Sequence, residues 1–298
     1  MAKVQFEEIK LIVPWGHVAA RTYGSRAGEP VLMVHGREDN AGTFTRLMKY
    51  LPMESFYYVC IDLPGHGWSS HFPSWMTLSC VEYANALHFI LKALQWQTCI
   101  YIGHSMGAQI GIIFSVIEPH RLKKLICLDG FLFIHKQFDK DTFINYYKQQ
   151  YAYMLKGSSN VKPPSYTKEE ILYAFKNKRL GNLNSEAADA LFERAATEVN
   201  GKYILNRDVR TKNYPFLHLN LDECRQINCR ISAPLYMFIA SESALTIGDT
   251  FFQKMKNEVQ VPITNFKING NHDVHNNNPE KIAPYLCEVL NTGEKSKL

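Results

Sequence analysis

The chain has 298 residues and a mass of 34.3 kDa, and its 46% hydrophobic content supplies enough core for one large α/β domain or two small ones. This composition excludes extensive disorder. The formal net charge is only +5, and the basic residues are scattered without runs, so neither a nucleic-acid partner nor an anionic membrane surface is indicated.

The cysteines and the amino-terminal residues both indicate an intracellular protein. Seven cysteines form an odd set without a Cys-x-x-Cys pair, which favours buried thiols in a reducing compartment. They are Cys60, Cys80, Cys99, Cys127, Cys224, Cys229 and Cys287. The first ten residues have no continuous apolar run of the kind found in secretory signals. The uncharged stretch 97–117 is interrupted by glycines and polar residues, so no membrane span is predicted.

Strand-like and helix-like patterns alternate over the first 130 residues, which predicts an α/β fold with a mostly parallel sheet covered on both faces. The sheet is expected to begin with an antiparallel hairpin of residues 9–13 and 17–23, joined by the short turn 14–16. Further strands are predicted at 31–35, 57–62, 99–102 and 124–129, and helices at 44–51 and 79–94. The second of these helices opens with a capping box, Ser79-x-x-Glu82.

This alternation stops after residue 130, where the pattern becomes helical. No convincing strand is found in 131–228, whereas Phe143, Tyr147, Tyr151 and Leu155 share one helix face and 168–176 also reads as a helix. Strands resume at 235–240 and 264–268, and a closing helix at 279–290 starts with a proline. We therefore predict an α/β core formed by 1–130 and 229–292, an inserted helical cap at 131–228, and a tail at 293–298.

The segment Gly103–Gly107 matches Gly-x-Ser-x-Gly, and it lies between a predicted buried strand and a predicted helix. The small flanking residues allow a strained turn that raises a serine hydroxyl above the sheet at a helix N-terminus. Ser105 is therefore the candidate nucleophile.

A serine hydroxyl needs a base to take its proton. Among eleven histidines, His272 directly follows the last predicted strand, so it should lie at the sheet edge where Ser105 emerges. His275 is its nearest rival, and a solvated or supporting role suits it better.

Two residues compete for the carboxylate that would hold the base in one tautomer. Asp129 ends the strand after the nucleophile strand and keeps the chain order Ser, Asp, His, whereas Glu242 lies just beyond the following strand. We favour Asp129 and keep Glu242 as the alternative.

An oxyanion hole needs two backbone N–H groups aimed at the developing negative charge. Met106, directly after the serine, is predicted to supply one, and Arg37, in the loop after strand 31–35, the other. Asp39 and Asn40 are expected to fix that loop. Since the sequence contains neither metal-ligand spacing nor a phosphate-binding glycine motif, no metal and no cofactor are predicted.

The sequence finishes with Ser296-Lys297-Leu298, which is the tripeptide that the peroxisomal import receptor recognises at a free carboxyl terminus. Peroxisomal residence is therefore expected, with a cytoplasmic pool allowed.

Taken together, these residues resemble the α/β-hydrolases from about residue 11 to 290, and in particular the serine hydrolase-like proteins of the kraken type. The matching segments, in order, are 13–17, His35-Gly36 with Asp39-Asn40, 65–67, 103–105, 205–208, and 270–272 with Val274-His275. The resemblance implies a serine nucleophile at Ser105, a base at His272 and a helical cap.

The sequence departs from the wider family after strand 235–240. Many α/β-hydrolases place the triad acid there, about three residues beyond a glycine, but Ala240 stands at the glycine position and Ser243 at the acid position. This departure favours Asp129. Epoxide hydrolases and haloalkane dehalogenases carry an aspartate where Ser105 stands, so their chemistry is disfavoured.

The leading hypothesis is a metal-independent serine hydrolase that cleaves a carboxylic ester or thioester, with a hydrophobic or lipid-derived substrate. The alternatives are a non-catalytic ligand-binding protein on the same fold, and another capped-hydrolase chemistry such as a haloperoxidase-like reaction or C–C bond hydrolysis.

Overall fold

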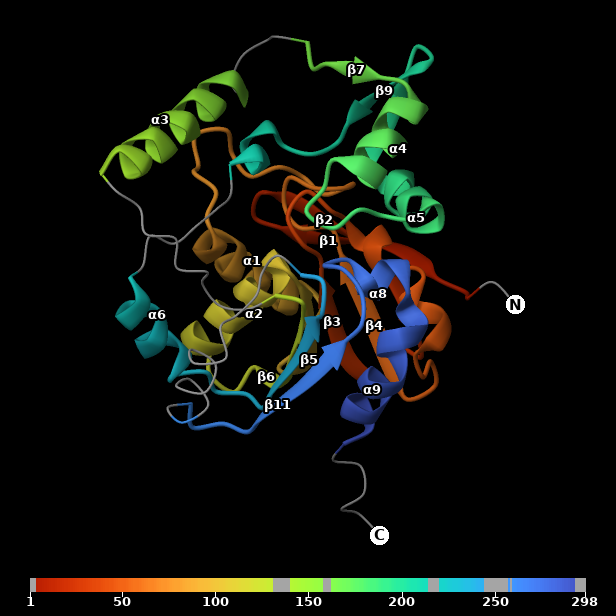
Figure 1. The fold of residues 1–298 in the computed structure, drawn as a ribbon, viewed down its shortest axis with the longest axis vertical. Coiled ribbons are helices and arrows are strands. Elements are labelled where there is room, and N and C mark those ends of the chain that lie inside the picture. The colour runs from red at the N-terminus through yellow and green to blue at the C-terminus, as the bar shows by residue number, and fades with distance from the viewer. Residues whose placement is uncertain are drawn as a thin grey trace.

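The computed structural model describes residues 4–130, 140–157, 162–213, 220–243, 257 and 259–292. Its centre is an eight-stranded sheet in the order β1-β2-β4-β3-β5-β6-β10-β11 (Figure 1). The strands are β1 (Glu7–Val13), β2 (Gly16–Gly24), β3 (Glu29–Val34), β4 (Phe56–Ile61), β5 (Cys99–His104), β6 (Leu122–Leu128), β10 (Leu235–Ala240) and β11 (Ile263–Ile268). β2 is antiparallel to β1 and to β4, and all other neighbours are parallel. The predicted mostly parallel sheet with an amino-terminal hairpin is confirmed.

Both faces of the sheet are covered, because strands such as β5 are buried along their whole length and need apolar partners on each side. Helices α1 (Cys80–Ala93) and α2 (Met106–Ile117) pack in the apolar cluster on one face. On the other face lie α9 (Pro279–Asn291) and two 3₁₀ segments, η1 (Ala41–Phe44) and η2 (Leu47–Tyr50).

The predicted helix 44–51 is wrong, since this stretch forms 3₁₀ turns. The Asn40 side chain accepts a hydrogen bond from the Gly42 N–H at 2.9 Å and starts a tight turn at Ala41. The start of α1 agrees with the prediction, because the Ser79 hydroxyl accepts a hydrogen bond from the Val81 N–H at 3.1 Å.

The segment predicted to form the cap, called the cap below, lies over the carboxyl ends of the parallel strands, in the upper part of Figure 1. It contains α3 (Lys140–Gly157), α4 (Lys168–Asn177), α5 (Ser185–Ala195) and η3 (Val209–Lys212). It also contains a small sheet in the order β7 (Ser165–Tyr166), β9 (Lys202–Leu205), β8 (Ala196–Val199).

The expectation that residues 131–228 hold no strand is therefore wrong. β8 and β9 form a hairpin whose turn residues, Asn200 and Gly201, have φ of 52° and 75°. Asn-Gly is a strong hairpin signal because both residues tolerate this backbone region, so the sequence contained the information that the prediction missed.

Two segments that bear on the site complete the fold. Helix α6 (Leu221–Asn228), at the end of the predicted cap range, contacts α2 and so lies beside the core. Helix α8 (Val274–Asn277) begins two residues after the predicted base, His272. Within the described residues, no helix is both long and apolar enough to span a membrane.

Candidate active site

Ser105 occupies a sharp turn between β5 and α2. Its φ of 51° and ψ of −116° lie outside the ordinary regions for a residue with a side chain, which is the strain expected of a nucleophile turn. The turn fits only because the residues two positions before and after the serine, Gly103 and Gly107, lack side chains. A Cβ on Gly103 would lie 2.5 Å from the Gly107 carbonyl carbon, and a Cβ on Gly107 would lie 2.2 Å from the Val34 carbonyl oxygen.

Asp129 stands beside this turn because of strand register. β5 and β6 are parallel with His104 opposite Leu128, so the residues that follow, Ser105 and Asp129, lie next to each other at the same sheet edge. Asp129 is buried, and its φ of 41° turns the chain away from β6. Its Oδ1 atom accepts a hydrogen bond from the Ala240 N–H at 2.9 Å, which fixes the carboxylate.

His272 reaches this carboxylate from the loop after β11. Its Nδ1 lies 2.6 Å from Asp129 Oδ2, and both side chains are buried. The bond directs the other ring nitrogen, Nε2, away from the carboxylate, which is the orientation that a general base requires.

Glu242 lies elsewhere. Its side chain is exposed, and its N–H donates to the Gly270 carbonyl oxygen at 2.9 Å. In the described part of the chain, Glu242 forms no hydrogen bond with the His272 ring. The geometry thus brings Asp129, and not Glu242, to His272.

The Ser105 hydroxyl also forms no hydrogen bond with the His272 ring in the described part of the chain. A serine-to-base contact often tightens only when substrate binds.

The loop after β3 packs directly on the serine turn. A Cβ on Gly36 would lie 3.1 Å from Ser105 Cβ, so Arg37 follows a residue in contact with the candidate nucleophile. Met106 is the first residue of α2, where N–H groups have no acceptor within the helix. Both residues therefore lie where an oxyanion hole needs them, and the role of their N–H groups stays a prediction. The Arg37 side chain contacts the cap, since its guanidinium donates a hydrogen bond to the Lys212 carbonyl oxygen at 3.3 Å.

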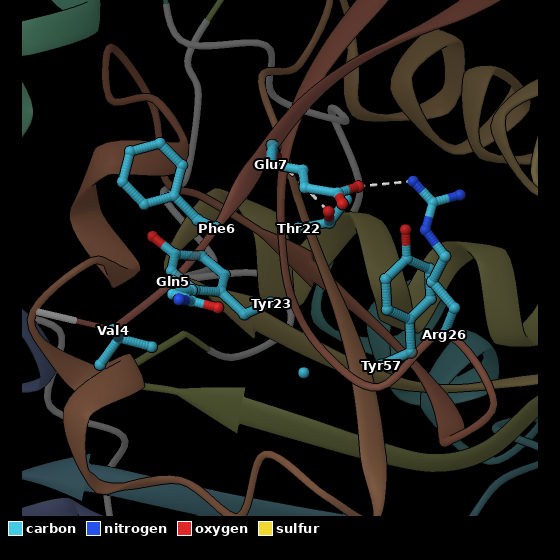
Figure 2. Close-up of a pocket in the computed structure, with 9 residues that line it drawn as sticks. Val4, Gln5, Phe6, Glu7, Thr22, Tyr23, Arg26 and Tyr57 are labelled. Atoms are coloured by element: carbon cyan, nitrogen blue, oxygen red, sulfur yellow. Dashed lines mark hydrogen bonds and ion pairs between the residues drawn. The ribbon is translucent and has the colours of Figure 1, made fainter.

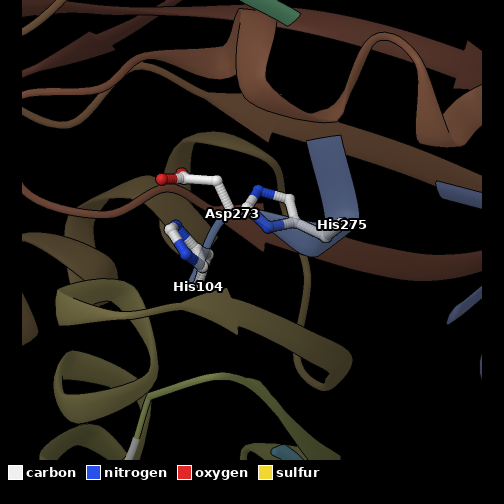
Figure 3. Close-up of side chains that lie close together, drawn as sticks. All are labelled: His104, Asp273 and His275. Atoms are coloured by element: carbon white, nitrogen blue, oxygen red, sulfur yellow. The ribbon is translucent and has the colours of Figure 1, made fainter. Parts of the chain in front are cut away.

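A buried polar cluster that the sequence analysis did not predict includes His104, the residue directly before Ser105 (Figure 3). His104 and His275 stack with ring centroids 4.0 Å apart, and one atom each of His104, Asp273 and His275 could ligate a metal, all within 4.8 Å. Burial and the nearby His272 lower the pKa of His104 to about 3, and burial with His104 lowers the pKa of His275 well below its usual value. His275 is thus not solvated, and its Nε2 lies 3.0 Å from the Thr43 hydroxyl.

The geometry of this cluster does not favour a metal site. The two rings overlap instead of converging on one point, with an angle of 39° between their planes. Moreover, the cap residue Arg179 already supplies a positive charge, because its Nη2 donates to Asp273 Oδ1 at 3.2 Å and its Nη1 pairs with Asp39 Oδ1 at 2.6 Å. No sequence signal singled out Arg179, which has neither a motif nor a spacing that points to Asp39 and Asp273.

A cavity of about 680 Å³ lies between α4, β9 and the loop after β3. Apolar and aromatic side chains, including Ile171, Phe175 and Leu205, form part of its wall, and charged residues, among them Asp39 and Arg179, form the rest. Tyr147 and Tyr151 of α3 do not line this cavity, and their side chains are 47% and 59% exposed. Other aromatic residues, from α4 and β7, line the cavity instead.

A second hollow, of about 470 Å³, lies at the opposite edge of the sheet (Figure 2). It is formed by the start of β1, the end of β2 and the start of β4, and an exposed ion pair between Glu7 and Arg26 stands at its side. Since these strand ends are far along the sheet from Ser105, we assign this hollow no part in the site.

A strained serine turn between a buried strand and a helix, with a buried carboxylate and histidine at the same sheet edge, defines an α/β-hydrolase of the serine type. The chain belongs to the α/β-hydrolase fold family, whose model matches residues 29–248.

Its relatives in that family are serine hydrolase-like proteins. The chain is 31% identical to the serine hydrolase-like protein of Danio rerio, over 95% of this chain and 88% of that protein. It is 29% identical to the serine hydrolase-like protein 2 of Homo sapiens, over 95% of this chain and 93% of that protein.

Solved structures confirm the fold. A hypothetical protein of Pseudomonas aeruginosa matches with a TM-score of 0.80 at 24% identity, covering 95% of this chain and 98% of that chain. The thioesterase domain from the curacin biosynthetic pathway also matches with a TM-score of 0.80, at 20% identity, covering 96% of this chain and 99% of that chain.

Proposed function

We propose that the protein hydrolyses carboxylic esters or thioesters through an acyl-enzyme on Ser105, with His272 as the general base and Asp129 as the carboxylate that orients it. The main support is the 2.6 Å contact between His272 Nδ1 and Asp129 Oδ2, at the sheet edge where the strained Ser105 turn emerges. A buried carboxylate holds one imidazole tautomer and stabilises the imidazolium that forms during the reaction.

The proposed reaction has two halves. His272 Nε2 takes the proton of the Ser105 hydroxyl while Oγ attacks the carbonyl carbon, and the N–H groups of Met106 and Arg37 hold the resulting oxyanion. The tetrahedral intermediate collapses, and His272 gives its proton to the leaving alcohol or thiol. A water molecule, deprotonated by the same histidine, then attacks the acyl-enzyme and releases the acid.

The cavity under the cap supports a hydrophobic substrate. Its volume of about 680 Å³ is in the range of small-molecule sites, and Ile171, Phe175 and Leu205 form the apolar part of its wall. Ser105 and His272 are not among its lining residues, so this support concerns the acyl portion of a substrate and not the reacting bond. We therefore propose a hydrophobic or lipid-derived acyl compound as substrate.

Labelling of the purified protein with a fluorophosphonate probe tests this proposal. We expect rapid labelling of the wild type, and its loss in both Ser105→Ala and His272→Ala, because the first removes the nucleophile and the second removes its base. A panel of esters, acyl-CoA thioesters, C–C hydrolase substrates and haloperoxidase substrates would then identify the reaction class.

A folded wild type that is not labelled would contradict the proposal and favour the non-catalytic ligand-binding alternative. Peroxisomal residence is a separate proposal, which concerns residues 296–298, outside the described residues. A fluorescent fusion that ends in Ser296-Lys297-Leu298, compared with one that lacks this tripeptide, would test receptor-mediated import.

A further inference from the structure

The cap segment directly after α4 packs on the loop that carries His272. A Cβ on Gly181 would lie 2.4 Å from Asp273 Oδ2 and 2.9 Å from His272 Cβ, so the cap backbone is in direct contact with the candidate base. The Asn182 carbonyl oxygen accepts hydrogen bonds from the side-chain amides of Asn271 and Asn277, each at 2.9 Å. The cap is therefore attached to both ends of the short stretch that positions His272.

Arg179, at the start of this cap segment, joins the His272 loop to the loop after β3. Its Nη1 lies 2.6 Å from Oδ1 of Asp39, and its Nη2 lies 3.2 Å from Oδ1 of Asp273. Asp39 is two residues beyond Arg37, the predicted oxyanion-hole residue, and Asp273 directly follows His272. One guanidinium thus connects the loops that carry the predicted oxyanion donor and the base.

The charges make this connection strong. Asp39 and Asp273 are buried, and within the described residues no other lysine or arginine pairs with either of them. Burial disfavours the charged form of Arg179, but the two carboxylates outweigh this effect and raise the pKa of Arg179, which keeps it protonated. Without the guanidinium, two buried carboxylates would face each other uncompensated, which is strongly unfavourable.

We propose that Arg179 is a positioning residue that couples the cap to the assembly of the active site. By neutralising Asp39 and Asp273 together, it fixes the distance between the oxyanion loop and His272, and when the cap is displaced this arrangement is lost. The inference rests on the proposed function for its kinetic consequences, but the coupling of the two loops is a structural property that can be measured independently.

The test compares three variants. Arg179→Met removes the charge and the donors while keeping the side-chain length, and Arg179→Lys keeps the charge but lacks the planar fork that reaches two carboxylates. Arg225→Met is the matched control, because Arg225 also lies in the predicted cap range and pairs with an aspartate, Asp222, at 2.9 Å. Arg225 does not line the cavity under the cap, and its partner Asp222 belongs neither to the loop after β3 nor to the His272 loop.

Three measurements are made on each protein: the fluorophosphonate labelling rate, kcat and KM for a p-nitrophenyl ester, and hydrogen–deuterium exchange of segments 36–43 and 270–278. For Arg179→Met we expect labelling and kcat to fall by about 10- to 100-fold, with KM changed by less than about threefold, because misplaced groups slow the chemical step more than binding. Exchange should rise in both segments. Arg179→Lys should recover part of kcat, and Arg225→Met should stay within about twofold of the wild type.

A double-mutant cycle shows whether Arg179 acts through its partner. In an Asp273→Asn background, Arg179→Met should lower kcat much less than in the wild type, because the partner charge is already absent. Additive losses would overturn the inference, as would a kcat for Arg179→Met within about twofold of the wild type or an equal loss in Arg225→Met.

Failure of the proposed function gives a different result. An unlabelled wild type would contradict catalysis by Ser105, whereas exchange would still report on the loops. In that case, unchanged exchange in Arg179→Met would overturn the inference, and raised exchange confined to the two segments would support it. Cooperative urea unfolding of each variant excludes global misfolding as the cause.

Discussion

Asp129, directly after β6, contacts His272 with 2.6 Å between its Oδ2 and the histidine Nδ1. His272 follows β11, and β10 lies between β6 and β11 in the sheet, so the contact reaches across an intervening strand. β10 contributes a backbone group instead, because the Ala240 N–H donates to the other carboxylate oxygen of Asp129. The carboxylate is therefore fixed from both sides, by the base and by the backbone of the intervening strand.

The assignment of the carboxylate predicts different outcomes for two conservative variants. Asp129→Asn should lower kcat/KM by about 10⁴-fold, because an amide favours the wrong imidazole tautomer. Glu242→Gln should change kcat/KM by less than about twofold, because the Glu242 side chain is exposed. Steady-state kinetics on a p-nitrophenyl ester, with circular dichroism to verify folding, would measure both. Small and equal losses would contradict the assignment.

The contact between Gly181 and the His272 loop predicts that one methyl group disturbs catalysis. In Gly181→Ala, the added Cβ would approach Asp273 Oδ2 to 2.4 Å and His272 Cβ to 2.9 Å, so the loop must move. We expect kcat to fall by about tenfold or more. Gly201→Asn is the control, since nothing lies within 4 Å of its Cβ and asparagine tolerates its positive φ. An unchanged kcat in Gly181→Ala would show that the loop position does not matter for turnover.

Arg194 predicts a large effect on stability. It is fully buried on α5, and its guanidinium pairs with Asp62 and with Glu8, each at 2.7 Å, so it joins the cap to the core. Arg194→Met should lower the free energy of unfolding by about 3–5 kcal/mol, because it leaves Asp62 buried without its cation. Urea denaturation measures this. Arg26→Met, which breaks an exposed pair with Glu7, should leave the midpoint unchanged, and equal shifts in the two variants would refute the argument.

Buried histidines predict that stability falls in mild acid. Burial is the main cause that lowers the pKa values of His35, His66, His104 and His275, with His104 at about 3. Below the unfolded value of 6.5, the unfolded chain binds protons that the folded chain does not, so stability decreases as the pH falls. Between 6.5 and about 3, the unfolded chain holds a proton on His104 that the folded chain does not, so this residue alone should make stability fall as the pH falls.

Urea unfolding between about pH 7.5 and about pH 5 would measure this dependence. The free energy of unfolding should be nearly constant above 6.5 as far as these groups are concerned, and it should decrease below that pH. Substitution of the exposed His120 by asparagine should leave the slope unchanged. A free energy that rises on acidification would contradict neutral, buried histidines.

Local sequence determined the elements around the candidate nucleophile. Gly103 and Gly107 indicate a turn that no larger residue fits, and the apolar run around Gly103 forms the buried strand β5. His272 and Asp129 each follow a strand, which places both residues at the same sheet edge. These features are readable because they depend on neighbours in the chain and on the period of the pattern. The hairpin at Asn200-Gly201 was equally readable, and the prediction of a purely helical cap overlooked it.

The contact of His272 with Asp129 and not with Glu242, and the pairing of Arg179 with Asp39 and Asp273, arise only in the tertiary structure. Both depend on which side chains meet when distant segments pack: Asp129 and His272 are 143 positions apart in the chain, and Arg179 and Asp273 are 94 apart. The residues next to a charged side chain in the sequence do not indicate its ion-pair partner, because the interaction energy that selects the pair arises only when both charges are removed from water together.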